Sequence, residues 1–92
     1  MKKNNWPVTL EDAVKQTLSM LSAKDKKHIA KMPEEKTILL HMSLGMQIRN
    51  SFGLHQGNEA LMIACGNPFD PDEVSGIIIE AVWKKLKAGK GK

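Results

Sequence analysis

The sequence predicts an all-α protein, folded as a compact single-domain bundle of about five helices with a long central helix. Apolar residues recur at spacings of three and four, helix-capping residues precede these runs, and no segment shows the sustained alternation of a β-strand. The 92 residues, of which 41% are hydrophobic and 26% charged, suit one domain over residues 1–92. Within it we expect an N-terminal arm over 1–6 and a basic tail over 88–92.

The first two helices are predicted from their capping residues. Thr9 stands shortly before two acidic residues and is suited to cap a helix whose apolar positions continue to Leu21. Ser22, with Asp25 three residues later, forms a second start signal. This signal predicts a short helix that ends near Lys31.

A long central helix is predicted to begin at Pro33, because proline is tolerated in a first turn and two acidic residues follow it. Gly53, directly after Phe52, is predicted to end this helix in the left-handed conformation, with Leu54 folding back onto it. The middle of the helix is so apolar that we expect other helices to cover it on several sides. Its apolar residues are Ile38, Leu39, Leu40, Met42, Leu44, Met46 and Ile48.

Two further helices complete the bundle. Asn58 is predicted to cap a short fourth helix that ends at Gly66, and Asp70 to cap a fifth helix that runs to about Ala88. The β-branched run 77–79 by itself favours a strand, but the apolar residues around it recur at helical spacing. The upstream cap and first-turn proline therefore favour a helix.

Cysteine usage and hydropathy indicate the cellular location. Cys65 is the single cysteine and cannot form an intramolecular disulfide, and the first residues carry no apolar stretch of the kind found in signal peptides. We therefore expect a cytoplasmic protein. No apolar run approaches the ~20 residues that span a bilayer, so we expect no membrane association of that kind.

The net charge of +4 is concentrated at the two ends of the chain. Residues 1–3 and 84–92 hold seven of the fourteen basic residues, which leaves seven basic against ten acidic residues over 4–83, a net charge of −3. One interpretation is that the C-terminal lysines bind nucleic acid. We favour the other, that they complement the dipole of the last helix. No aromatic residue that could stack on a base follows Trp83, which argues against nucleic-acid binding. The lysines at the C-terminal end, which include those of the last helix, are Lys84, Lys85, Lys87, Lys90 and Lys92.

One stripe of the predicted central helix combines polar groups with a glycine. His41, Gly45 and Arg49 are spaced four apart and therefore lie on one face. Because glycine in a helix interior costs ~1 kcal/mol relative to alanine, we expect something to approach the backbone there. It is either an anionic or planar ligand held by Arg49 or, as we favour, the fifth helix at Ser75 or Gly76.

Glu80 is the one charged residue within the apolar run 77–83 of the predicted fifth helix. A carboxylate in such surroundings needs a partner, and we expect a structural ion pair with Arg49, whose guanidinium matches a carboxylate in geometry. The alternative is a small-ligand or hydrolytic site around His41, Arg49 and Glu80. The sequence offers neither a second acid nor a metal ligand for such a site.

The turn after the central helix carries polar residues whose presence is not explained by the requirements of the backbone. His55 and Gln56 have no evident structural role and are expected to be exposed, which suits a contact patch on a surface loop. The predicted binding residues are Arg49, Asn50, His55, Gln56 and Asn58. We expect no metal site, because His28, His41, His55 and Cys65 lack the short spacings of known metal sites, and we expect no cofactor.

Three motifs together resemble a family of small bacterial helical domains of unknown function. They are Thr-Leu-Glu-Asp-Ala-Val at 9–14, His41 with Leu-Gly-Met-Gln-Ile-Arg-Asn at 44–50 and Phe-Gly-Leu at 52–54, and the segment 72–83 that contains Ser-Gly-Ile-Ile-Ile-Glu-Ala-Val-Trp. The resemblance spans most of the chain and implies a helical fold without implying an activity, ligand or partner. The matching positions are His41, Gly45, Arg49, Asn50, Gly53, Gly57, Asn58, Glu80 and Trp83.

We therefore expect a non-enzymatic protein-protein interaction module that binds through the corner from Arg49 to Asn58 and the adjacent helix faces. A regulatory, antitoxin-like or inhibitory role suits its size. The family resemblance implies an aromatic residue in many members where His55 stands, so a catalytic role shared across the family is not expected there. Nucleic-acid binding through the lysine tail and a small-ligand site remain the alternatives.

Overall fold

The computed structural model describes residues 6–66 and 70–89. These residues form helices and no strand, which confirms the predicted all-α fold class. They form five α-helices and one 3₁₀ helix, here called η1, which lies between the second and the third α-helix. The elements are α1 (Leu10–Met20), α2 (Ala23–Ala30), η1 (Glu34–Met42), α3 (Leu44–Ser51), α4 (Glu59–Ala64) and α5 (Pro71–Lys87).

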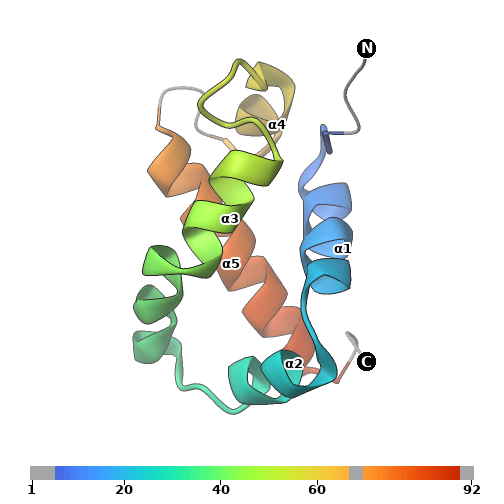
Figure 1. Ribbon diagram of the computed structural model, residues 1–92, viewed down its shortest axis with the longest axis vertical. Helices are drawn as coiled ribbons and strands as arrows, with labels where there is room; N and C mark the ends of the chain where they lie inside the picture. The colour runs from blue at the N-terminus through green and yellow to red at the C-terminus, as the bar shows by residue number, and fades with distance from the viewer. Residues whose placement is uncertain (1–5, 67–69, 90–92) are drawn as a thin grey trace.

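The C-terminal helix α5 takes the central position in the fold. It runs diagonally through the molecule, and α1, α2, α3 and η1 all pack against it (Figure 1). The buried apolar side chains lie on one broad side of α5, whereas Glu73, Glu80 and Lys84 on the other side are exposed. The buried apolar residues are Val74, Ile78, Ile79, Val82 and Leu86.

The predicted long central helix is divided at Ser43, whose φ of −115° and ψ of −72° separate η1 from α3. Leu40 of η1 and Leu44 and Ile48 of α3 are buried, so one side of these two helices faces the core. Thr37 and His41 are half-buried beside Leu40. The expectation that neighbouring helices cover this segment is therefore wrong for several residues. Ile38, Met42 and Met46 are 65%, 81% and 54% exposed, and Leu39 is exposed too.

The predicted helix starts are confirmed. The side chains of Thr9, Ser22, Asn58 and Asp70 each accept a hydrogen bond from a backbone N–H two or three residues later, at 3.0–3.3 Å. Each bond satisfies one of the backbone donors that a helix N-terminus leaves without an intrahelical partner. These caps fix where four of the five α-helices begin.

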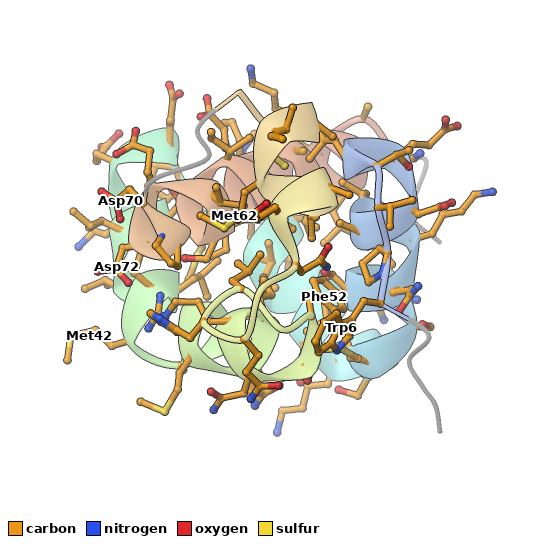
Figure 2. The ribbon with its side chains drawn as sticks, turned by 90° about the horizontal axis from the view of Figure 1, so that it is seen from above. Trp6, Met42, Phe52, Met62, Asp70 and Asp72 are labelled. Atoms are coloured by element: carbon orange, nitrogen blue, oxygen red, sulfur yellow. The ribbon has the colours of Figure 1, made fainter. Side chains whose placement is uncertain are left out.

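The corner after α3 is also built as predicted. Gly53 has a φ of +68°, and the N–H of Leu54 returns to the carbonyl oxygen of Arg49 at 3.1 Å. The indole of Trp6 lies so close to Gly53 that a Cβ there would be 2.3 Å from it. Figure 2 shows Trp6 and Phe52 in the same part of the molecule. The last described residue of the predicted arm therefore helps to close this corner.

At the other end, Ala88 caps α5 and the N–H of Gly89 bonds to the carbonyl oxygen of Leu86 at 3.0 Å. The rest of the predicted arm (1–5) and of the predicted tail (90–92) lies outside the described residues, as does 67–69 before the cap of α5. Within the described ranges, every helix is either too short or too polar to cross a bilayer.

Candidate functional site

Asn58, one of the predicted binding residues, is committed to holding the fold together. Its side chain is 5% exposed, and its amide nitrogen donates to the carbonyl oxygens of Phe52 and Pro7 at 2.7 and 3.0 Å. Its Oδ1 accepts from the backbone N–H of Leu61 at 3.3 Å. These three bonds join the segment before α1, the end of α3 and the start of α4, so Asn58 is a structural residue.

Arg49 pairs with a carboxylate other than the predicted one. Its Nε lies 3.4 Å from Asp72 Oδ1 and its Nη1 donates to Ser75 Oγ at 3.0 Å, with the side chain 17% exposed. Glu80 instead lies 3.5 Å from Lys84, four residues later on the exposed side of α5. The predicted pair of Arg49 with Glu80 is therefore not the one that forms.

The reason lies in where α3 meets α5. Arg49 folds back over Gly45, where a Cβ would lie 3.2 Å from its Nη1, and reaches the first turns of α5. Glu80 is eight residues beyond Asp72, or about 12 Å along the helix axis. Gly45 also contacts α5 through Ile79, whose Cδ1 would be 3.5 Å from an added Cβ. α3 packs against α5, as predicted, but Gly45 meets the Ile79 side chain at an ordinary contact distance, and neither Ser75 nor Gly76 is among its nearest neighbours.

The two small residues of α5 accommodate side chains from the opposite elements. Ser75 receives the guanidinium of Arg49, and Gly76 lies under the imidazole of His41, whose Cε1 would be 2.7 Å from a Cβ at that position. His41 belongs to η1 and Arg49 to α3, so their predicted common stripe bends at Ser43. Both side chains nevertheless turn toward the same part of α5.

Three members of the predicted contact patch lie on the surface. Asn50, His55 and Gln56 are exposed, as expected for His55 and Gln56. They follow the Arg49 anchor at the end of α3 and in the turn behind it. Their binding role stays a prediction.

An exposed apolar surface, which the sequence interpretation missed, lies beside this corner. We call it the η1–α3 face and define it by Ile38, Met42 and Met46. Met42 and Met46 line a hollow of about 340 Å³ together with His41, Arg49 and Asp72. Ile38, Met42 and Met46 are spaced four apart, about half a helical turn from the buried line of Leu40, Leu44 and Ile48. Both lines are apolar, so the sequence alone does not show which of them is buried.

A second hollow of about 350 Å³, which we call the acidic hollow, adjoins the first because His41 and Asp72 line both. It lies between η1 and the N-terminal half of α5, and four carboxylates line it. They are Asp70, Asp72, Glu73 and Glu80. In Figure 2 Met42 points away from the body of the protein on the side where Asp70 and Asp72 lie.

The predicted ligand-site residues are divided between these two hollows. His41 and Glu80 line the acidic hollow, whereas Arg49 lines the neighbouring one with His41. Arg49 is already bonded to Asp72 and Ser75. Among the described residues, no three His, Cys, Asp or Glu side chains gather in a way that suits a metal ion.

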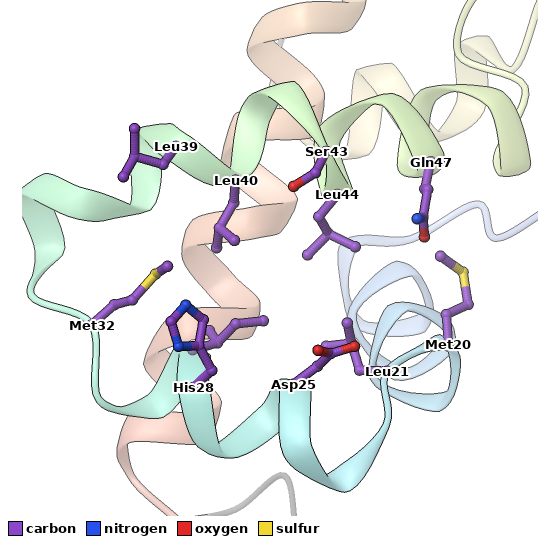
Figure 3. Close-up of a pocket in the computed structure, with 11 residues that line it drawn as sticks. Met20, Leu21, Asp25, His28, Met32, Leu39, Leu40, Ser43, Leu44 and Gln47 are labelled. Carbon is purple, nitrogen blue, oxygen red and sulfur yellow. The ribbon is translucent and has the colours of Figure 1, made fainter.

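A larger groove of about 520 Å³ lies on the other side of η1, between η1 and α3 on one wall and α1 and α2 on the other (Figure 3). Its polar residues include Asp25, His28 and Gln47. Apolar side chains from both walls point into it, among them Met20, Leu21, Met32, Leu39 and Leu44. The thin 3₁₀ helix thus has an open hollow on each side.

Lysines gather at the end of the molecule where α2 packs against the C-terminal part of α5. The carbonyl oxygen of Met32 accepts from Trp83 Nε1 at 2.8 Å and from Lys87 Nζ at 3.2 Å, and Lys87 also lies 5.3 Å from the Trp83 ring centroid. Of the five C-terminal lysines, Lys84, Lys85 and Lys87 belong to α5, while Lys90 and Lys92 lie outside the described residues. The lysines of α2 and its cap are Lys24, Lys26, Lys27 and Lys31.

Cys65, the C-cap of α4, is half-buried, and burial raises the pKa of its thiol. A raised pKa keeps the thiol protonated and poorly nucleophilic near neutral pH.

Comparisons with curated proteins and with solved structures find no match for this chain. One family model, described as a domain of unknown function (DUF6794), matches residues 6–86. The matched region runs from the Trp6 contact at the corner to the penultimate residue of α5 and contains both hollows beside η1. The chain therefore belongs to the DUF6794 family of domains of unknown function, as the resemblance of its motifs predicted.

Proposed function

We propose that this domain is a non-enzymatic protein-binding module and that its partner docks on the η1–α3 face. The observation that carries the proposal is the exposure of Ile38, Met42 and Met46 beside two hollows. Contiguous apolar surface that is rimmed by polar residues is typical of protein-binding sites. Methionine is well suited to such a surface because its flexible thioether adapts to the shape of a partner.

The predicted corner patch extends this face. Asn50 lies four residues after Met46, one turn along α3 on the same side. His55 and Gln56 follow in the exposed turn, so the three polar residues supply a rim at one end of the apolar surface. A polar rim around a small apolar centre is the usual arrangement at protein-protein interfaces.

The two helices that carry the face, η1 and α3, are packed against α5 on their opposite side. Leu40, Leu44 and Ile48 are buried against α5, and the Arg49 contacts with Asp72 and Ser75 fix α3 to the same helix. A partner therefore meets a surface whose support is already ordered, which lowers the entropy cost of binding. A single, half-buried cysteine supports a reducing, cytoplasmic setting. A regulatory, antitoxin-like or inhibitory role suits a domain of 92 residues.

The experiment that tests the proposal removes the two methionines. Burying a methionine contributes about 1.5–3 kcal/mol, and Met42 and Met46 are already partly covered, so Met42→Ser with Met46→Ser should cost about 2 kcal/mol of binding. That loss corresponds to about thirty-fold weaker affinity for a partner isolated from the native host. Ile63→Ser on α4, where Ile63 is 62% exposed, is the matched control and should leave affinity unchanged. Equal affinity of all three proteins would contradict the proposal.

A second candidate function is polyanion binding at the lysine-rich end. The packing of α2 against α5 favours it, because it places the lysines of both helices at one end of the molecule. Binding to duplex or single-stranded DNA should then weaken steeply with salt. Replacing Lys27, Lys31 and Lys85 by glutamine should lower the salt dependence by about one unit of slope for each phosphate contact that is lost. Salt-insensitive binding would exclude this function.

A further inference from the structure

We propose that the partner element that docks on the η1–α3 face is a basic amphipathic helix, and that one of its lysine or arginine side chains enters the acidic hollow. This inference rests on the proposed function and adds the chemistry of the partner. It combines two observations: the exposed apolar side chains of the face, and the charge of the hollow beside it.

The charge beside the face is negative. Asp72 is matched by Arg49 and Glu80 by Lys84. Within residues 6–66 and 70–89, no salt bridge is found for the exposed carboxylates of Asp70 and Glu73. Asp70 and Glu73 belong to the cap and first turn of α5, where acids favour the helix dipole. Their position at the helix start explains their residue type, and their common hollow with Glu80 gives a cationic side chain of a partner a place to bind.

The acidic rim continues along η1. Glu35 is exposed and lies three residues before Ile38, so in a 3₁₀ helix the two residues and His41 follow one line. A partner that covers Ile38 therefore meets carboxylates on η1 and on α5. A guanidinium or ammonium group satisfies such carboxylates with charge-assisted hydrogen bonds, and arginine does so bidentately.

A helix is the partner element that fits this surface. An extended peptide gains affinity by adding to the edge of a sheet, and the described residues offer no strand to extend. A helix satisfies its own backbone hydrogen bonds and needs only an apolar stripe on the receiving surface. From Ile38 to Met46 the face spans about 14 Å along η1 and α3, which corresponds to roughly three turns of a partner helix.

The electrostatics also orient the partner and exclude competitors. The lysine-rich end formed by α2 and the C-terminal part of α5 repels a basic helix, whereas the acidic hollow attracts it. Nucleic acids and anionic lipid surfaces carry the charge that the acidic hollow repels. The one competitor that this charge does not exclude is a second copy of this chain, because its own lysine-rich end is basic.

The test uses two synthetic helical peptides of about five turns that have the same leucine stripe, with lysine on the polar side of one and glutamate on that of the other. We expect the lysine peptide to bind and to shift the backbone amide NMR signals of Ile38, Met42, Met46 and Ile77. The glutamate peptide should bind at least about ten-fold more weakly at low salt. Equal binding of both peptides, or signal shifts confined to the groove between α2 and η1, would overturn the inference.

Matched charge variants complete the test. Glu73→Gln with Glu80→Gln should weaken the lysine peptide about five-fold, whereas Glu11→Gln with Glu59→Gln on α1 and α4 should change its affinity less than about two-fold. Sedimentation of the full chain alone should show no association that depends on Met42 and Met46, since such association would make a second copy the occupant and overturn the inference.

The outcomes also separate this inference from the proposed function. If Met42→Ser with Met46→Ser abolishes binding of the native partner but Glu73→Gln with Glu80→Gln leaves it unchanged, the proposed docking face is supported and the proposed basic helix is refuted. If the native partner survives the methionine variants, both proposals are wrong.

Discussion

Replacing Asn58 by alanine is expected to destabilise the protein by about 3 kcal/mol. The side chain makes two donated bonds, to Phe52 and Pro7, and one accepted bond from Leu61, all in a buried site. A typical intramolecular hydrogen bond contributes about 1 kcal/mol net, and partners left unsatisfied in a buried site raise that cost. Loss of a helix N-cap by itself accounts for about 1 kcal/mol of the total.

Thermal and urea unfolding followed by circular dichroism measure this loss. A change of about 1 kcal/mol shifts the Tm of a domain of this size by about 4–8 °C, so the Tm of Asn58→Ala should fall by about 12–24 °C. Asn50→Ala is the matched control, because Asn50 is exposed on α3, and its unfolding free energy should change by less than about 0.5 kcal/mol.

Asn58→Asp separates the contributions within this loss. It keeps the oxygen that caps α4 and removes both donated bonds, so it should lose most of the stability that alanine loses. If Asn58→Ala lowers the free energy of unfolding by less than about 1 kcal/mol, the hydrogen bonds of Asn58 do not stabilise the corner. The side chain would then be available for the binding role that the sequence suggested.

Two further stability predictions follow from Gly53 and Cys65. Gly53→Ala should lower the free energy of unfolding by about 1–2 kcal/mol because of its left-handed φ of +68°, and by more because the new Cβ displaces Trp6. Gly57→Ala, at φ +100° with no atom near its Cβ, is the control and should show the backbone cost alone. Equal losses in urea unfolding would rule out the Trp6 contact. Because burial raises the pKa of Cys65, the folded protein keeps its thiol proton when the unfolded chain has lost it, so this contribution to stability is full below about pH 8.5 and declines above it. Iodoacetamide should therefore alkylate the native thiol at a higher pH than the urea-unfolded thiol, and identical pH profiles would contradict the burial.

The features that local sequence determines were predictable. Each cap of α1, α2, α4 and α5 depends on one side chain and a backbone N–H two or three residues away, and the stop at Gly53 depends on a missing Cβ. Such signals act within one turn, so they can be recognised without knowing the tertiary fold. The helical class and most helix boundaries follow from them.

The candidate site depended on contacts between distant segments. Arg49 pairs with Asp72 because α3 crosses the first turns of α5, and no local signal places that crossing there instead of beside Glu80. The exposure of Ile38 and Met42 depends on which side of η1 packs against α5, and Leu40 is the residue buried there. Their apolar character was evident, but its orientation was not.

Binding of a protein partner to the η1–α3 face can be measured with the partner isolated from the native host. Its affinity is compared for the wild type, for Met42→Ser with Met46→Ser, and for Ile63→Ser. We expect about thirty-fold weaker binding for the methionine variant alone, with all three proteins equally folded. Unchanged affinity in that variant, or an equal loss in Ile63→Ser, would contradict the proposed docking face.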